Sequence, residues 1–147
     1  NYVRLDRHIT PIMYDDLDDF SYGFNVLEEG TDGYFISTGV MVNEALDYSD
    51  NKVGVIDLHT IPCHELSLVE KIKDKKIITL EEHFLPGGLG SYILELISDY
   101  GINTKVKRLG LKSEYIYRYG GRQDNWDYHG LKSSNIIKIK DEFLERI

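Results

Sequence analysis

The chain has 147 residues, 41% of them hydrophobic and 29% charged, which is enough for one domain with a proper core. Its net charge of −8 argues against nucleic acid as a partner, because nucleic-acid binders need a basic surface. No apolar run approaches the ~20 residues that cross a bilayer, and no leader pattern is visible, so we expect a soluble protein with no membrane partner. The single cysteine, Cys63, cannot form an internal disulfide, which favours a cytoplasmic location.

The first residues predict an extended segment followed by a linker. Residues 1–8 have a strand-like composition, and the chain opens within them, so we expect residues 1–19 to be the tail of a preceding domain and its linker. Pro11 favours extended geometry in its neighbour, and several aspartates keep the linker solvated. Residues 20–147 are then expected to form one domain.

From residue 24 onward, predicted strands and helices alternate. The strands are expected over 24–27, 34–37, 53–58, 77–80 and 105–111, and the helices over 42–48, 65–73, 88–100 and 134–147. The helix over 88–100 has one apolar face, which includes Leu96 and Tyr100, and Gly101 follows it as a C-terminal glycine. Ser133 or Ser134 is the expected N-cap of the last helix. Residues 112–132 show no clean period.

This alternation predicts the fold class. Strands separated by helices favour a mostly parallel sheet that is covered on both faces. No helix separates the first two strands, which are joined by the turn over 30–33, so one strand is expected to be antiparallel. We therefore expect an α/β fold, a three-layer α/β/α sandwich with about five strands.

Three segments, in this order, resemble the carboxy-terminal domain of the transketolase family. The first is I-S-T-G-V-M-V-N-E-A-L at 36–46, and the second is V-I-D-L-H-T-I-P at 55–62. The third is I-T-L-E-E-H at 78–83, followed by G-G-L-G-S at 87–91, and it is the most specific. The resemblance covers nearly the whole chain, although residues 115–126 match no motif of the family.

The resemblance implies a parent enzyme that transfers a two-carbon ketol unit between sugar phosphates. In the family, thiamine diphosphate and magnesium are held by two other domains, on the same or a companion chain. The resemblance therefore implies no catalytic, cofactor-binding or metal residue in this chain, which would instead supply domain packing and the contacts of a homodimer. Two alternatives stay open: a stand-alone interaction or regulatory module with this fold, and part of a 2-oxoacid dehydrogenase beta subunit.

Arg7, with Arg4, is the candidate substrate contact. The sequence Y-V-R-L-D-R at 2–7 resembles the end of the family's pyrimidine-binding domain, where an arginine reaches the sugar phosphate. A guanidinium suits phosphate because its fork donates two hydrogen bonds at once. The alternative is a structural arginine at the end of a strand.

Two glycine-rich segments are more simply explained by structure than by ligand binding. The loop over 86–91 follows a strand and opens a helix, so its amides could hold an anion, but Glu81 and Glu82 oppose phosphate there. The segment Gly30–Gly33 superficially matches the Gly-Asp-Gly cofactor motif of the family, but it lies between two strands. We expect it to be a turn.

The remaining candidates are polar residues at strand ends. His59, Cys63, His64 and His83 have the chemistry of zinc ligands without a known spacing, and Cys63 has no paired base for nucleophilic catalysis. Glu81, Glu82 and His83 have the chemistry for acid–base work, but we favour a structural or interface role. The tyrosines of 115–128 are expected at an interface.

Overall fold

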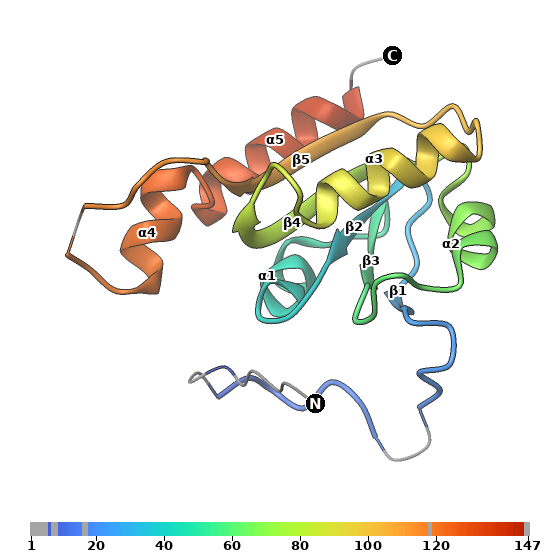
Figure 1. Ribbon diagram of the computed structural model, residues 1–147, viewed down its shortest axis with the longest axis horizontal. Coiled ribbons are helices and arrows are strands. Elements are labelled where there is room, and N and C mark those ends of the chain that lie inside the picture. Colours follow the sequence, from blue (N-terminus) through green and yellow to red (C-terminus); the bar gives the residue numbers. More distant parts are fainter. Residues whose placement is uncertain (1–5, 7–8, 16–17, 118, 146–147) are drawn as a thin grey trace.

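The computed structural model describes residue 6 and residues 9–15, 18–117 and 119–145 (Figure 1). Over these residues the strands are β1 (Asn25–Glu28), β2 (Gly33–Ser37), β3 (Val53–Asp57), β4 (Lys76–Phe84) and β5 (Val106–Leu111). The helices are α1 (Met41–Tyr48), α2 (Glu65–Ile72), α3 (Leu89–Asp99), α4 (Arg122–His129) and α5 (Ser133–Glu145). Among the helices of this described part, none has the length and apolar character needed to span a membrane.

The strands form one mixed sheet in the order β1-β3-β2-β4-β5. β1 pairs antiparallel with β3, whereas β2 pairs parallel with both β3 and β4, and β4 pairs parallel with β5. The central strand β2 is buried at every position, because helices cover both faces of the sheet. The predicted mostly parallel sheet with one antiparallel strand is confirmed.

Each face of the sheet has its own hydrophobic core, because successive side chains of a strand point to opposite faces. Phe35 of β2 packs into the core that contains α1, Trp126 of α4 and Ile136 of α5. Tyr34 and Ile36 belong to the opposite core, which is formed with α2 and α3. The three-layer α/β/α architecture predicted from the alternation is therefore confirmed.

The predicted apolar face of α3 is largely confirmed. Leu89, Ile93 and Leu96 are buried in the core shared with α2. Tyr100 was expected on the same face, but it occupies the C-cap position, is exposed, and donates from its hydroxyl to Glu65. Gly101 follows with a φ of +61°, a left-handed conformation that glycine adopts without steric cost.

The structure corrects the sequence prediction at three places. β4 continues to Phe84 rather than ending at residue 80. Residues 122–129 form α4, although the sequence shows no clean period there, because only Trp126 and His129 are buried on this helix. At the start of α5, the N–H of Ile136 donates to the carbonyl of Lys132, so Lys132 takes the N-cap position expected for Ser133 or Ser134.

Candidate functional site

The candidate site lies at the carboxyl ends of the parallel strands. In open α/β sheets, ligands bind outside these ends, in the crevice between two strands whose connections leave to opposite faces. Here β2 leads into α1 on one face and β4 leads into α3 on the other. The crevice therefore lies between the ends of β2 and β4, where Ser37 pairs with Leu80.

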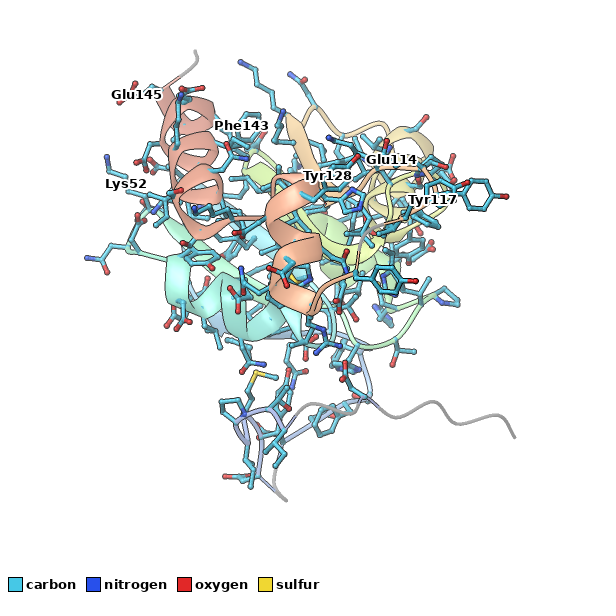
Figure 2. The ribbon with its side chains drawn as sticks, turned by 90° about the vertical axis from the view of Figure 1, so that its left-hand side faces the viewer. Lys52, Glu114, Tyr117, Tyr128, Phe143 and Glu145 are labelled. Carbon is cyan, nitrogen blue, oxygen red and sulfur yellow. The ribbon has the colours of Figure 1, made fainter. Side chains whose placement is uncertain are left out.

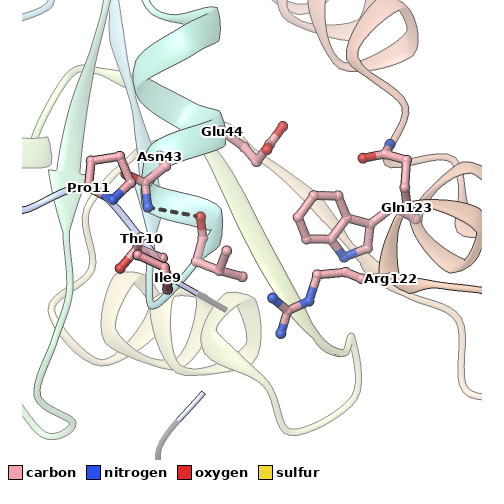
Figure 3. Close-up of a pocket in the computed structure, with 9 residues that line it drawn as sticks. Ile9, Thr10, Pro11, Asn43, Glu44, Arg122 and Gln123 are labelled. Carbon is pink, nitrogen blue, oxygen red and sulfur yellow. Dashed lines mark hydrogen bonds between the residues drawn. The ribbon is translucent and has the colours of Figure 1, made fainter. Parts of the chain in front are cut away.

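A pocket of about 260 Å³ occupies this region (Figure 3). Its walls come from three segments: the N-terminal segment before the sheet, the start of α1, and α4. The lining residues are Ile9, Thr10, Pro11, Val40, Asn43, Glu44, Arg122, Gln123 and Trp126. The chain's own N-terminal segment thus forms one wall of the crevice where an α/β sheet ordinarily binds a ligand.

Arg122 holds the α4 side of the pocket. Its Nε donates to Glu82 Oε1 at 2.9 Å, and its Nη2 donates to Asp6 Oδ2 at 2.6 Å. Because two carboxylates already neutralise this guanidinium, and Glu44 adds a third carboxylate to the wall, the pocket is poorly suited to a phosphate. The geometry instead ties the N-terminal segment to α4.

Glu82 fixes α4 against the end of β4. Its Oε1 also accepts a hydrogen bond from Trp126 Nε1 at 3.0 Å, so one carboxylate oxygen binds two side chains of the same helix. Trp126 itself is buried against the core of this face. Both contacts of Glu82 are therefore structural, in agreement with the interpretation favoured for the E-E-H segment.

Glu81 is fully buried and binds the first turn of α3. Its carboxylate accepts the N–H of Leu89 at 2.7 Å and the N–H of Gly90 at 2.9 Å. The amides that might have cradled an anion in the loop over 86–91 thus hold the protein's own carboxylate. His83 Nδ1 lies 3.8 Å from Glu81 Oε2, and its side chain is mostly exposed.

Asp57 ties the other end of the N-terminal segment to the sheet. This buried residue ends β3, and its Oδ2 accepts a hydrogen bond from the hydroxyl of Tyr14 at 2.6 Å. Burial raises the pKa of Asp57, and the hydrogen bond from Tyr14 opposes that shift. Phe20 packs edge-on against both Tyr14 and His59. The sequence did not single out Asp57, although the V-I-D motif contains it.

The four residues with zinc-ligand chemistry make other contacts. His64 Nδ1 lies 3.0 Å from the Ser67 hydroxyl, and His59 Nδ1 lies 3.0 Å from the Thr60 hydroxyl. In the described ranges, no three His, Cys, Asp or Glu side chains lie together as a set of metal ligands. Burial raises the pKa of the Cys63 thiol, which disfavours the nucleophilic thiolate.

The described residues do not fit magnesium diphosphate. Gly30–Gly33 is a turn between β1 and β2, in which Asp32 accepts from the Thr31 hydroxyl and its own N–H donates to the Lys52 carbonyl. The N-terminus of α3, the other place with free amides in the sequence prediction, is closed by Glu81. Arg4 and Arg7 lie outside the described residues, so their predicted contact with a sugar phosphate stays a prediction.

Comparisons with known proteins agree with this fold. The sequence model described as "Transketolase, C-terminal domain" matches residues 23–136. A transketolase C-terminal section from Methanocaldococcus jannaschii is 30% identical over 146 residues, which cover 93% of this chain and 46% of that one. One of the subunits of an apulose-4-phosphate transketolase from Actinobacillus succinogenes is 30% identical over 147 residues, which cover 94% of this chain and 47% of that one.

A solved structure shares the same architecture. It is a split-gene transketolase described as an inactive beta4 tetramer, and it superposes with a TM-score of 0.76 at 24% identity, covering 91% of this chain and 46% of that one. The chain belongs to the transketolase C-terminal domain family. It spans about half the length of the curated relatives it matches.

Proposed function

We propose that this chain is the carboxy-terminal part of a thiamine-diphosphate-dependent enzyme that transfers a two-carbon ketol unit between sugar phosphates in the cytoplasm. The observation that carries the proposal is the match over residues 23–136 to the transketolase C-terminal domain, together with relatives about twice as long. In this proposal residues 1–19 are the tail of a preceding domain, and residues 20–147 are the domain itself.

The proposal assigns the cofactor to other domains. Glu81 closes the α3 N-terminus, and the Gly30–Gly33 turn lies between strands, so the described part of this chain lacks a fit for magnesium diphosphate. Thiamine diphosphate, when bound, supplies the nucleophilic carbon that accepts the ketol unit. In the proposed enzyme it is held by domains upstream, on the same polypeptide or on a companion chain.

The proposed contribution of this domain is to pack against those upstream domains and to supply part of a homodimer surface. The ties from Asp6 to Arg122 and from Tyr14 to Asp57 support this role, because they fix the N-terminal segment across the edge of the sheet. Arg7 is proposed to bind the phosphate of the sugar substrate, just before this fixed segment.

The test is a transferase assay on the complete protein, with its companion chain if the enzyme is split. We expect thiamine-diphosphate- and magnesium-dependent transfer of a ketol unit from a ketose phosphate to an aldose phosphate. Decarboxylation of pyruvate or of a branched 2-oxoacid, without ketol transfer, would assign the chain to another thiamine-diphosphate enzyme. An absence of both activities would favour a stand-alone interaction module.

A further inference from the structure

The loop between β5 and α4 is fixed at both of its ends. At its start, the N–H of Lys112 donates to His129 Nδ1 at 3.1 Å, and Lys112 Nζ lies 5.4 Å from the ring centroid of Tyr128. At its end, Arg122 binds Glu82. The loop is therefore presented by a helix that is itself anchored to the sheet.

The side chains that this loop presents are aromatic. Tyr115, Tyr117 and Tyr119 are 87%, 87% and 105% exposed, and Ile116 lies between the first two. The rings of Tyr115 and Tyr117 are 6.1 Å apart, and Figure 2 shows Tyr117 pointing away from the body of the protein. Exposed apolar clusters of this kind mark interaction surfaces, and tyrosine is enriched in interfaces because its ring buries area while its hydroxyl finds a polar partner.

The tyrosine loop, as we call Tyr115, Ile116, Tyr117 and Tyr119, lies beside the start of the described chain. Tyr119 is three residues before Arg122, which binds Asp6 at 2.6 Å. α4 and the loop before it project from one end of the molecule (Figure 1). A chain of five residues spans at most ~17 Å, so any domain that precedes residue 1 is held close to these tyrosines.

We infer that the tyrosine loop is the docking surface for the domain that precedes residue 1 in the same polypeptide. This inference rests on the proposed function, in which such a domain exists. The fitting surface is apolar at its centre, to receive the rings, and carries hydrogen-bond acceptors at its rim for the phenol hydroxyls. It is neutral or basic overall, because the present chain has a net charge of −8.

The tie between Asp6 and Arg122 makes this docking intramolecular. A linked surface is present at an effective concentration set by its short tether, so a contact too weak to form between separate molecules is populated within one. Docking of this kind also explains why a loop with three almost fully exposed tyrosines begins and ends on fixed contacts, since a pre-ordered surface loses little entropy on binding.

The experiment is tyrosine nitration of the complete polypeptide, with site-by-site rates from mass spectrometry. Tyr22 is the internal reference, because it is only 47% exposed in this domain and lies far from the loop in sequence. We expect Tyr117 and Tyr119 to react about tenfold more slowly than Tyr22, the factor for a docked state favoured by ~1.4 kcal/mol. Faster reaction of the loop tyrosines than of Tyr22 would overturn the inference.

Dilution separates the preceding domain from a second copy of the chain. Protection by a domain of the same polypeptide is independent of protein concentration, whereas protection that disappears on dilution assigns the loop to a dimer contact and overturns the inference. The transferase assay runs on the same sample. Active enzyme with reactive loop tyrosines refutes docking alone, and inactive protein with protected tyrosines supports docking while refuting the proposed function.

Discussion

The carboxylate of Glu81 lies 2.7 Å from the backbone nitrogen of Leu89 and closes the first turn of α3 from inside the protein. The N-terminus of a helix carries unpaired N–H groups and a partial positive charge, which a buried carboxylate satisfies. Gly88 has to be glycine, because a Cβ there would overlap the Glu81 carboxylate. The E-E-H segment and the glycine-rich loop after it are thus one structural unit.

The first prediction is that Glu81→Gln destabilises the domain. Both carboxylate oxygens accept a backbone N–H, and an amide offers only one acceptor, so one buried N–H loses its partner. We expect a loss of about 1.5–3 kcal/mol in the free energy of unfolding, the usual size for a hydrogen bond to a charged group. Urea denaturation measures it. Glu70→Gln, on the exposed face of α2, is the control and should change stability by less than about 0.5 kcal/mol.

The second prediction compares two leucines of α3. Leu96 is 3% exposed in the core shared with α2, whereas Leu94, on the same helix, is 40% exposed. Leu96→Ala should cost about 2–5 kcal/mol by removing buried methyl groups and leaving a cavity. Leu94→Ala should cost less than about 1 kcal/mol, since little of it leaves water on folding. Equal losses in urea melts would mean that the buried face of α3 is misassigned.

The third prediction concerns the pH dependence of stability at Asp57. Burial raises the pKa of Asp57 above its ordinary value of 3.8, so the folded state holds this proton to a higher pH than the unfolded state does. The resulting stabilisation is complete below the unfolded pKa and is lost as the pH rises through the folded pKa.

Asp57→Asn removes that dependence and keeps an oxygen that accepts from Tyr14. The stability of the variant relative to wild type should therefore increase as the pH rises from below 3.8, and should level off above the folded pKa. Tyr14→Phe should extend this window upward, because it removes a hydrogen bond that lowers the pKa of Asp57. A difference between the Asn variant and wild type that stays constant with pH would contradict the account.

The regular part of the fold was predictable because its signal is repeated along the sequence. β2 has apolar residues on both faces, and α3 has buried residues at helical spacing, so period and burial agree. α4 escaped prediction since only Trp126 and His129 are buried on it, and much of its attachment is a pair of hydrogen bonds to Glu82 on a strand about 40 residues earlier. Such long-range polar contacts leave no periodic signal.

The candidate site was only partly predictable, for a related reason. The E-E-H and glycine-rich motifs identified Glu81 correctly as a structural residue, but which amides it would bind depends on where β4 ends. The tie between Tyr14 and Asp57 joins residues 43 positions apart, and neither residue type alone indicates the other. The sequence marked the 115–128 tyrosines as a surface without indicating that the start of the chain is bound beside them.

The fourth prediction concerns Arg7 in the complete enzyme. If its guanidinium binds the sugar phosphate, Arg7→Ala removes a charge-assisted hydrogen bond and should lower kcat/KM about 10- to 150-fold, the equivalent of ~1.5–3 kcal/mol. Arg7→Lys should restore part of the loss, because lysine supplies a charge without the fork. An unphosphorylated sugar is the control substrate and should be little affected. Equal losses on both substrates would identify Arg7 as a structural residue.

The most direct test of the account is calorimetry with thiamine diphosphate and magnesium, on this chain alone and on the complete protein with any companion chain. We predict micromolar binding by the complete protein and no binding heat for the chain alone, because the described residues do not fit magnesium diphosphate. Binding by the isolated chain would contradict the assignment of the cofactor to other domains. Failure of the complete protein to bind would contradict the proposed enzyme class.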